Sequence, residues 1–475
     1  MQKTFLSSLL IMVFLNLLIK PLALFGIDAT VQNRVGPSEY GVYFSLLNLS
    51  VILNILLDLG INNFTTKRIA QRPEIAKRYF GRIFSFRFIL FFIYFFSTLA
   101  LASILNYSSK AIYLLCILGA NQFFIISTAY CRSHFAGFHF FKTDALISVL
   151  DRFLLIIFGG FVLFSPFSKW TMSIEIFIWI QFICYFTTFC IALIFLYKHI
   201  EKPLLKWDLS FSFSFVKRSL PYALLIVLML LYTRLDGVML ERIHKNGAYE
   251  SGIFAQGFRL LDALYMFGMI FAGLLFPMFS KQLKNDASAV KPLLKTAGNL
   301  LISGALLIVI IAVFNSFYLL NLIYINVKEA IPAFQWLMFG FIAICMNFIF
   351  GTLLTANGSM KVLNITSSFG IIVNIGLNIW LIPRYGSEGA AFASFVTQSF
   401  TAFVQFFYCL RIFDLSISFN TISKYVLFVV LIVSMSYWQS KSNFLIFYQL
   451  FFGTLLMFTL SFIDFKNIRK LFLKG

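Results

Sequence analysis

The chain consists of long apolar runs separated by short polar connections, from its first residues to its last. Apolar residues make up 60% of the 475 residues and charged residues only 12%, against roughly 25% charged in an ordinary soluble domain. A water-soluble fold has too little interior to cover so much apolar surface. We therefore expect a protein whose solvent is the lipid bilayer.

About fourteen of these runs are long enough to cross a bilayer as helices. A crossing helix needs about 20 mainly apolar residues, because lipid offers no partner for backbone N–H and C=O groups. The predicted spans are residues 5–31, 40–65, 83–105, 110–131, 146–165, 173–197, 215–240, 251–280, 294–320, 331–356, 361–382, 388–410, 421–438 and 443–463. The first run is expected to be a permanent span and not a cleaved signal peptide, since Lys20-Pro21 interrupts it. The sequence thus predicts an all-α polytopic membrane protein.

The Lys and Arg residues are distributed unequally between the connections on the two sides of the membrane. With the N-terminus inside, 26 of the 38 Lys and Arg fall on the cytoplasmic side, including the stretch from Lys67 to Arg87, and 8 fall on the other side. This is the positive-inside pattern, and it predicts that both termini are cytoplasmic. A nucleic-acid-binding protein would gather its basic residues on one water-facing surface, so the formal charge of +20 does not indicate that class.

Cysteine and histidine give no sign of a metal site, a disulfide framework or a bound cofactor. The six cysteines lie within spans or at their ends, no two of them form a CxxC pair, and the chain has only four histidines. We predict no metal and no cofactor.

Two short segments suggest an internal repeat. Glu39-Tyr40-Gly41 opens the second predicted span and Glu250-Ser251-Gly252 opens the eighth, both from the outer side. Six spans separate them, as in two parallel repeats related by an axis along the membrane normal. We therefore predict an N-terminal six-helix bundle at 1–200, a cytoplasmic linker at 201–218, a C-terminal six-helix bundle at 219–411, and helices 13 and 14 with a cytoplasmic tail at 412–475.

Several motifs carry a family resemblance over nearly the whole chain. They are Arg34-Val-Gly-Pro-Ser-Glu39-Tyr40-Gly41, Leu57-Asp58-Leu59-Gly60, Arg234-Leu-Asp236-Gly, the stretch from Gly252 to Arg259, and Gly386-Ser-Glu-Gly389. Together they resemble the Wzx-type polysaccharide flippases of the multidrug/oligosaccharidyl-lipid/polysaccharide exporter superfamily. The resemblance implies two pseudo-symmetric six-helix bundles around a central cavity, two further C-terminal helices, and a place in the cytoplasmic (inner) membrane of a bacterium. It also implies export of O-antigen or capsule repeat units.

Ionisable side chains inside spans are the candidate site, because each costs roughly 2.5–3.5 kcal/mol at the bilayer centre unless it faces a wet or protein interior. We predict that Lys20, Arg234 and Arg259 line the cavity and hold a diphosphate, with Asp236 and Asp262 beside them. Arg suits bidentate phosphate contact and Lys a point-charge contact. The alternative is that Arg259–Asp262 and Arg234–Asp236 are local groups that serve folding; only the first pair has a spacing that places both side chains on one helix face.

Other carboxylates receive smaller roles. Asp28 and Asp58 are candidates for a gate or for ion coupling. Asp151 and Arg152 stand at the start of the predicted fifth span, where we expect an ordinary pair at the membrane interface.

The function expected from this pattern is translocation of a polyprenyl-diphosphate oligosaccharide by alternating access, with no covalent chemistry and therefore no enzyme activity. The expected partners are the lipid-linked oligosaccharide, membrane lipid and other polysaccharide-assembly proteins, and the expected state is a monomer. Alternatives are a multidrug/cation antiporter, whose cavity should be net acidic, and a lipid II flippase. A membrane glycan polymerase or glycosyltransferase fits less well, because the outer connections are short and hold no convergent acid pair.

Overall fold

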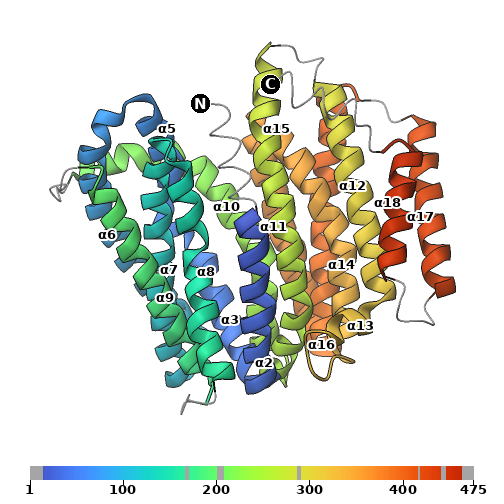
Figure 1. The fold of residues 1–475 in the computed structure, drawn as a ribbon, viewed down its shortest axis with the longest axis horizontal. Helices are drawn as coiled ribbons and strands as arrows, with labels where there is room; N and C mark the ends of the chain where they lie inside the picture. Colours follow the sequence, from blue (N-terminus) through green and yellow to red (C-terminus); the bar gives the residue numbers. More distant parts are fainter. Residues whose placement is uncertain are drawn as a thin grey trace. The chain divides into compact units, whose positions relative to one another are not determined.

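Every regular element in the part of the chain that the structure describes is a helix (Figure 1). The computed structural model describes residues 14–165, 171–200, 208–285, 290–415, 418–439 and 446–462. After a helical segment at 14–21, the elements are η1 (Leu22–Asp28), α2 (Ala29–Val35), α3 (Pro37–Leu53), α4 (Ile55–Asp58), α5 (Ile61–Gln71), η2 (Pro73–Ile75), α6 (Ala76–Ile104), α7 (Ser109–Gly137), α8 (Phe141–Phe164), α9 (Ile174–Tyr197), α10 (Leu209–Ile243), α11 (Gly247–Asn285), α12 (Val290–Phe314), α13 (Ser316–Asn321), α14 (Ala330–Met346), η4 (Asn347–Gly351), α15 (Thr352–Ala356), α16 (Met360–Ile412), α17 (Phe419–Gln439) and α18 (Ile446–Thr459).

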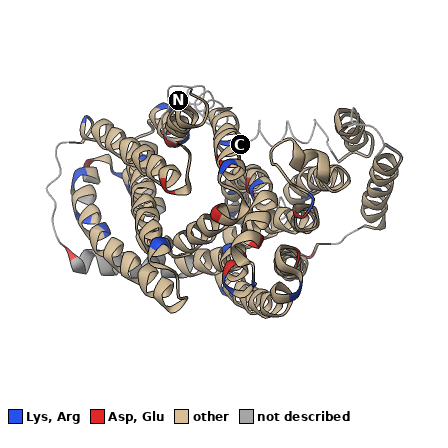
Figure 2. Ribbon diagram, turned by 90° about the horizontal axis from the view of Figure 1, so that it is seen from below, with Lys and Arg blue, Asp and Glu red and all other residues tan. Residues whose placement is uncertain are grey.

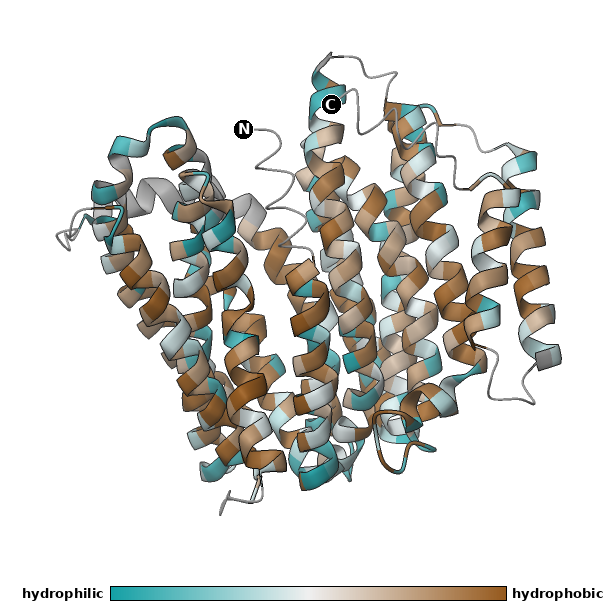
Figure 3. Cartoon of the chain, in the orientation of Figure 1, coloured by the Kyte–Doolittle hydropathy of each residue, from teal (hydrophilic) through white to brown (hydrophobic). Residues whose placement is uncertain are grey.

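The helices confirm an all-α polytopic membrane protein. Twelve described helices are long and apolar enough to cross a membrane, and α18 is a shorter apolar helix. The longest, α16, contains two of the predicted spans, because the helix is interrupted at Gly386 (φ 51°, ψ −128°). An apolar helix therefore stands at each of the fourteen predicted places. Figure 3 shows hydrophobic residues along most of the length of these helices.

The chain forms two compact units. The N-terminal unit comprises Met1–Arg242 with Asn246–Gly252, and the C-terminal unit comprises Ile243–Lys245 with Ile253–Gly475. The predicted bundle boundaries and the predicted cavity remain predictions. Residues 5–13 of the first predicted span, 201–207 of the predicted linker and 463–475 of the predicted tail lie outside the described residues, whereas helix α10 already begins at Leu209.

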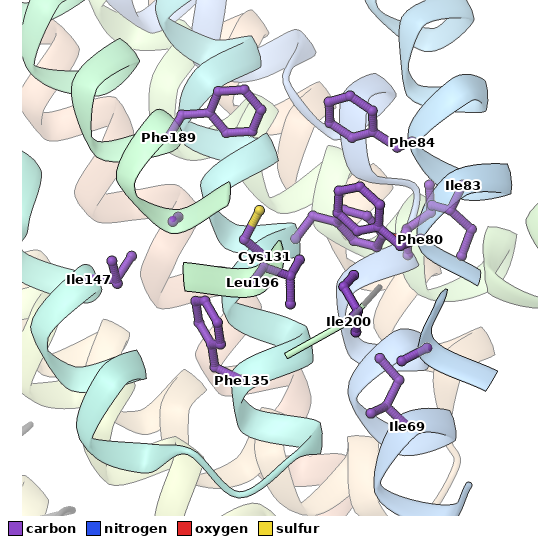
Figure 4. Close-up of a cluster of buried hydrophobic side chains, with 14 of the residues drawn as sticks. Ile69, Phe80, Ile83, Phe84, Cys131, Phe135, Ile147, Phe189, Leu196 and Ile200 are labelled. Atoms are coloured by element: carbon purple, nitrogen blue, oxygen red, sulfur yellow. The ribbon is translucent and has the colours of Figure 1, made fainter. Parts of the chain in front are cut away.

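The N-terminal unit is built on an aromatic core. Phe80 of α6 stacks on Tyr130 of α7, with ring centroids 5.5 Å apart, and on Phe84 at 5.3 Å. Leu196 near the end of α9 and Ile69 of α5 are fully buried in the same cluster, which Figure 4 shows. Helices α5, α6, α7 and α9 are therefore joined by one apolar core, as expected where burial against other helices replaces contact with lipid.

A buried arginine lies next to this core. Arg87 of α6 is only 2% exposed, and its guanidinium lies 4.5 Å from the centre of the Tyr130 ring. Its Nη2 pairs with Asp58 Oδ1 at 3.0 Å and donates to Asn62 Oδ1 at 2.7 Å, and its Nη1 donates to the Leu57 carbonyl at 3.2 Å. The assignment of Arg87 to a cytoplasmic connection is wrong, because the residue lies within α6 and is buried against α4 and α7.

The two glycines of the sequence repeat pack against each other. A Cβ on Gly41 of α3 would lie 1.8 Å from the carbonyl oxygen of Ala248, and a Cβ on Gly252 of α11 would lie 2.0 Å from that of Pro37. Each glycine thus faces the carbonyl group of the residue four positions before the other glycine. Ser251 Oγ donates to the Gly41 carbonyl at 3.2 Å. The repeat positions meet as a reciprocal pair because only glycine permits this backbone approach.

In the C-terminal unit the last two helices pack on α12. Phe428 and Ile432 of α17 and Met457 of α18 are buried against Leu307 and Ile311 of α12. Polar contacts accompany this packing: Asn315 Nδ2 donates to Gln449 Oε1 at 3.0 Å, and the Tyr425 hydroxyl donates to Asn299 Oδ1 at 3.2 Å.

Candidate functional site

Charged residues are few along the described helices (Figure 2), and several of those inside spans gather in the N-terminal unit. The first span, Phe14–Val35, lies against α8. Asn16 Nδ2 donates to Ser148 Oγ at 3.1 Å, and further along Ile27 fills the space beside Gly159. These contacts fix the register of the two helices, because the same spacing, about three turns, separates them on both helices.

Lys20 lies one turn after Asn16 on this interface. It is half-buried, and the charges of Arg152, Asp151 and Arg132 act on it. Arg132 in turn pairs with Asp144 at the start of α8, Nε to Oδ1, at 2.6 Å. Lys20 therefore faces a group of charges on α7 and α8.

Arg152 is the residue opposite Lys20, and its prediction as an interfacial group is wrong. Helix α8 begins at Phe141, so Arg152 stands eleven residues, or about 17 Å, along it. Its Nε is 3.5 Å from Asp151 Oδ2, and its guanidinium carbon is 5.8 Å from the ring centre of Tyr185 on α9. The error arose because the predicted span began at 146 and placed the pair too close to the membrane surface.

Asp28 belongs to the same interior group. Pro21 has no backbone N–H to donate, and the helix continues as the π-helical segment η1, the kind of local widening that often accompanies a functional position. Asp28 ends η1, is buried, and accepts a hydrogen bond of 2.8 Å from the Tyr40 hydroxyl. Both Asp28 and Tyr43 interact electrostatically with Arg152. The role of Asp28 in ion coupling or in a gate stays a prediction.

Tyr43 links α3 to α9 next to this group. Its hydroxyl accepts a hydrogen bond from Gln181 Nε2 at 2.8 Å, and its ring lies edge-on to Tyr40 with centroids 5.4 Å apart. Two tyrosines of α3 and Gln181 of α9 therefore contribute to the polar interior of the N-terminal unit.

Arg234 and Asp236 lie on α10 within the N-terminal unit. Asp236 is fully buried and Arg234 is half-buried. The neighbouring Gly237 packs against Asn48 and Phe44 of α3, since a Cβ at Gly237 would lie 2.6 Å from Asn48 Nδ2. The deep placement of both residues agrees with their position in a span, and their role stays a prediction.

Arg259 and Asp262 lie on α11 in the C-terminal unit. Arg259 Nη1 is 3.8 Å from Asp262 Oδ2, and the two side chains are 10% and 17% exposed. The spacing prediction, that these two side chains share a helix face, is confirmed. Asp58, by contrast, is held in the Arg87 network described above, where the backbone N–H of Asn62 also donates to its Oδ1 at 3.3 Å.

Lys20 follows Asn16 by four residues and Arg152 follows Ser148 by four, so the two face each other across the helix interface. Asp28 also interacts electrostatically with Arg152, a residue that sequence reasoning set aside. One sequence signal pointed to it. On α8 the polar residues Asp144, Ser148, Asp151 and Arg152 fall on one side of the helix, opposite exposed apolar residues at 146, 153, 157 and 161.

The packing of the first span on α8 gives a stability prediction with a built-in control. A Cβ at Gly159 would lie 2.8 Å from Ile27 Cγ2, whereas one at Gly160 would meet only Ile27 Cδ1, at 3.8 Å. Gly160→Ala should be neutral or stabilising by up to about 1 kcal/mol, as for alanine in a helix. Gly159→Ala should instead destabilise by about 1 kcal/mol. Thermal unfolding of the detergent-solubilised variants measures the difference; equal midpoints would contradict this register.

Known structures share this fold. The chain is similar to the lipid II flippase MurJ in an inward closed conformation, with a TM-score of 0.75 and 14% identity over 97% of this chain and 99% of that one. It is also similar to an inward-facing multidrug resistance MATE family transporter of the MOP superfamily (TM-score 0.57, 14% identity, 84% of this chain and 94% of that one). An outward-facing MATE transporter of that superfamily gives a TM-score of 0.60, with 15% identity over 86% and 94%.

The fold is therefore that of the MurJ and MATE transporters, a class of multi-pass membrane proteins. At the level of sequence, the model of the polysaccharide biosynthesis protein family matches residues 5–283, more than half of the chain. The chain belongs to the polysaccharide biosynthesis protein family. No curated protein matches it significantly.

Proposed function

We propose that this protein is a Wzx-type flippase, which moves a polyprenyl-diphosphate oligosaccharide across the cytoplasmic membrane of a bacterium for surface polysaccharide assembly. The observation that carries the proposal is the set of cations that lie within membrane spans: Lys20, Arg234 and Arg259. A family that serves polysaccharide biosynthesis handles sugar precursors, and the diphosphate is the anionic part of such a precursor.

In this proposal the substrate passes through a central cavity by alternating access. Lys20, Arg234 and Arg259 hold the diphosphate, Asp236 and Asp262 balance their charge in the empty protein, and the polyprenyl tail stays in lipid. Asp28 and Asp58 are the candidates for ion coupling or a gate. Both termini are cytoplasmic, and a single chain suffices.

The membrane potential supports outward movement of this substrate. Two negative charges moved outward across ~100 mV, inside negative, gain roughly 4–5 kcal/mol at about 2.3 kcal/mol per charge. No covalent step is needed, which agrees with a transporter fold. If new glycosidic bonds formed when the purified protein was incubated with labelled lipid-linked sugars, the chain would be an enzyme instead.

The proposal predicts the effect of three alanine variants. Lys20→Ala, Arg234→Ala and Arg259→Ala should each abolish export of surface glycan while the protein still inserts in the membrane, because each removes a phosphate contact. Liposomes that contain the protein and a fluorescent lipid-linked oligosaccharide measure the same step as access of an external reagent to the sugar. Full export by the Arg234 and Arg259 variants would refute the proposed site.

Lipid II is the second candidate substrate, since the fold resembles that of the lipid II flippase MurJ over the whole chain. Depletion in the native host separates the two. Loss of surface glycan with continued growth supports the oligosaccharide substrate, whereas cell lysis supports lipid II. A multidrug antiporter would need an acidic site, which the Lys20 and Arg152 pair does not favour.

A further inference from the structure

We propose that Arg152, together with Lys20, binds a phosphate group of the lipid-linked substrate at a site within the N-terminal unit. This inference rests on the proposed function and adds to it a binding residue on α8 and the chemistry that this residue recognises. Neither the sequence motifs nor the family match assigns Arg152 a role.

The position of Arg152 on α8 directs it to the interior of the unit. Five of the six exposed large apolar residues of α8 mark one face of the helix, which is suited to lipid: Leu146, Phe153, Ile157, Phe161 and Phe164, with Phe158 at its side. Ser148 and Gly159, which contact the first span, define the other side, and Arg152 follows Ser148 by one turn.

The Arg152 side chain is 36% exposed even though it stands in the middle of a span. A charged group in contact with hydrocarbon is costly, so we expect the exposed part of this side chain to face a polar space and not lipid. The charges of Lys20 and Asp28 from the first span, and the rings of Tyr43 and Tyr185, all act on it. Residues of the first span, α3 and α9 therefore act electrostatically on the guanidinium.

Lys20 and Arg152 carry like charges and repel each other across the helix interface. Within the described residues, the ion pair through Nε to Asp151 is the one polar contact of the Arg152 guanidinium that the structure contains. Of the other carboxylates nearby, Asp144 pairs with Arg132, whereas Asp28 accepts a hydrogen bond from the neutral Tyr40 hydroxyl. A doubly charged anion between the two cations would relieve their repulsion.

A phosphate fits this arrangement better than a carboxylate or a sugar alone. The two Nη groups form the outer edge of the guanidinium and can donate to two oxygens of one phosphate, while the Lys20 ammonium offers a point charge to another oxygen. The Tyr185 ring lies 5.8 Å from the guanidinium carbon and limits its orientation.

The test is binding of polyprenyl diphosphate to the full-length protein in zwitterionic nanodiscs. Polyprenol without phosphate and phosphatidylglycerol serve as separate probes. We expect Arg152→Ala and Lys20→Ala each to weaken polyprenyl diphosphate binding about 10- to 100-fold, the loss of a charge-assisted contact, with polyprenol and phosphatidylglycerol unchanged. Lys142→Ala is the matched control, since it removes an exposed cation from the first turn of the same helix and should change nothing.

A second variant separates binding from charge balance. In Asp151→Asn, Arg152→Gln the local ion pair is replaced by two neutral side chains, which protects folding. If Arg152 binds phosphate, this double variant stays as weak as Arg152→Ala; recovery of wild-type affinity would overturn the inference and leave Arg152 a partner of Asp151.

The remaining outcomes distinguish the two proposals. An equal loss of phosphatidylglycerol binding would identify a lipid headgroup site and overturn the substrate assignment of Arg152. Unchanged diphosphate binding in Arg152→Ala, with export still lost in Lys20→Ala and Arg234→Ala, would sink this inference but leave the flippase in place. If the wild-type protein bound no polyprenyl diphosphate, the proposed function itself would fail.

Discussion

Arg87→Ala should destabilise the protein by about 3–5 kcal/mol, the usual cost of removing one partner from a buried ion pair. The substitution leaves Asp58 without its 3.0 Å partner and takes hydrogen bonds from Asn62 and the Leu57 carbonyl. It also removes the cation from the face of Tyr130. We expect little folded protein in the membrane, because this loss approaches the whole stability of a typical domain.

The measurement is the yield of monodisperse protein after extraction, followed by thermal unfolding. Arg82→Ala is the matched control: it lies on the same helix and pairs with Asp208 at 2.9 Å, but both side chains are partly exposed, at 20% and 30%, so its loss should cost about 1 kcal/mol or less. The double variant Asp58→Asn, Arg87→Met should recover part of the stability. Equal behaviour of Arg82→Ala and Arg87→Ala would argue against a structural role for the buried network.

Gly252→Ala should be the second severe substitution. Its Cβ would lie 2.0 Å from the Pro37 carbonyl oxygen and 2.6 Å from the carbonyl carbon. Backbone atoms cannot rotate out of the way as a side chain can, so the start of α11 and the start of α3 must separate. We expect a loss of about 3 kcal/mol, at the upper end for an overpacked contact, together with loss of the Ser251 bond to the Gly41 carbonyl.

Gly41→Ala should have the same effect, because the contact is reciprocal. Gly273→Ala, on the same helix α11, is the control: nothing lies within 4 Å of its added Cβ, so it should be neutral or slightly stabilising. Unfolding temperatures of the three purified variants decide the matter. Wild-type stability in both Gly41→Ala and Gly252→Ala would show that the two helices do not approach this closely in the membrane.

The spans could be predicted from the sequence because their physical cause is local. A bilayer requires an apolar run of a certain length, and that property belongs to one segment at a time. The same holds for Arg259 and Asp262, whose spacing on one helix suffices to bring them together. The repeat pairing of Gly41 with Gly252 also came from the sequence, although their mutual contact did not.

Contacts between helices could not be predicted in this way. Arg152 and Arg87 were both misplaced for the same reason: a charged residue near the end of an apolar run was assigned to the membrane surface. In both cases the helix extends further, α8 from Phe141 and α6 from Ala76. A few residues of error at a helix start, at 1.5 Å each, separate a surface group from an interior one.

The partners of Arg87 and Arg152 come from helices distant in the sequence, and no spacing rule connects Arg152 to Tyr185 or Lys20. The sequence therefore predicted cations inside spans, but it did not place Arg152 opposite Lys20. That placement depends on the packing of the first span against α8.

The break at Gly386 has a mechanical consequence. The two arms of α16, residues 360–385 and 387–412, are joined through a single non-helical residue, and a Cβ at Gly389 would lie 2.7 Å from the Leu381 carbonyl oxygen across the bend. A connection of one residue restricts how far the two arms can move independently of each other. A protease or an inserted tag would therefore find almost no accessible chain between the two arms.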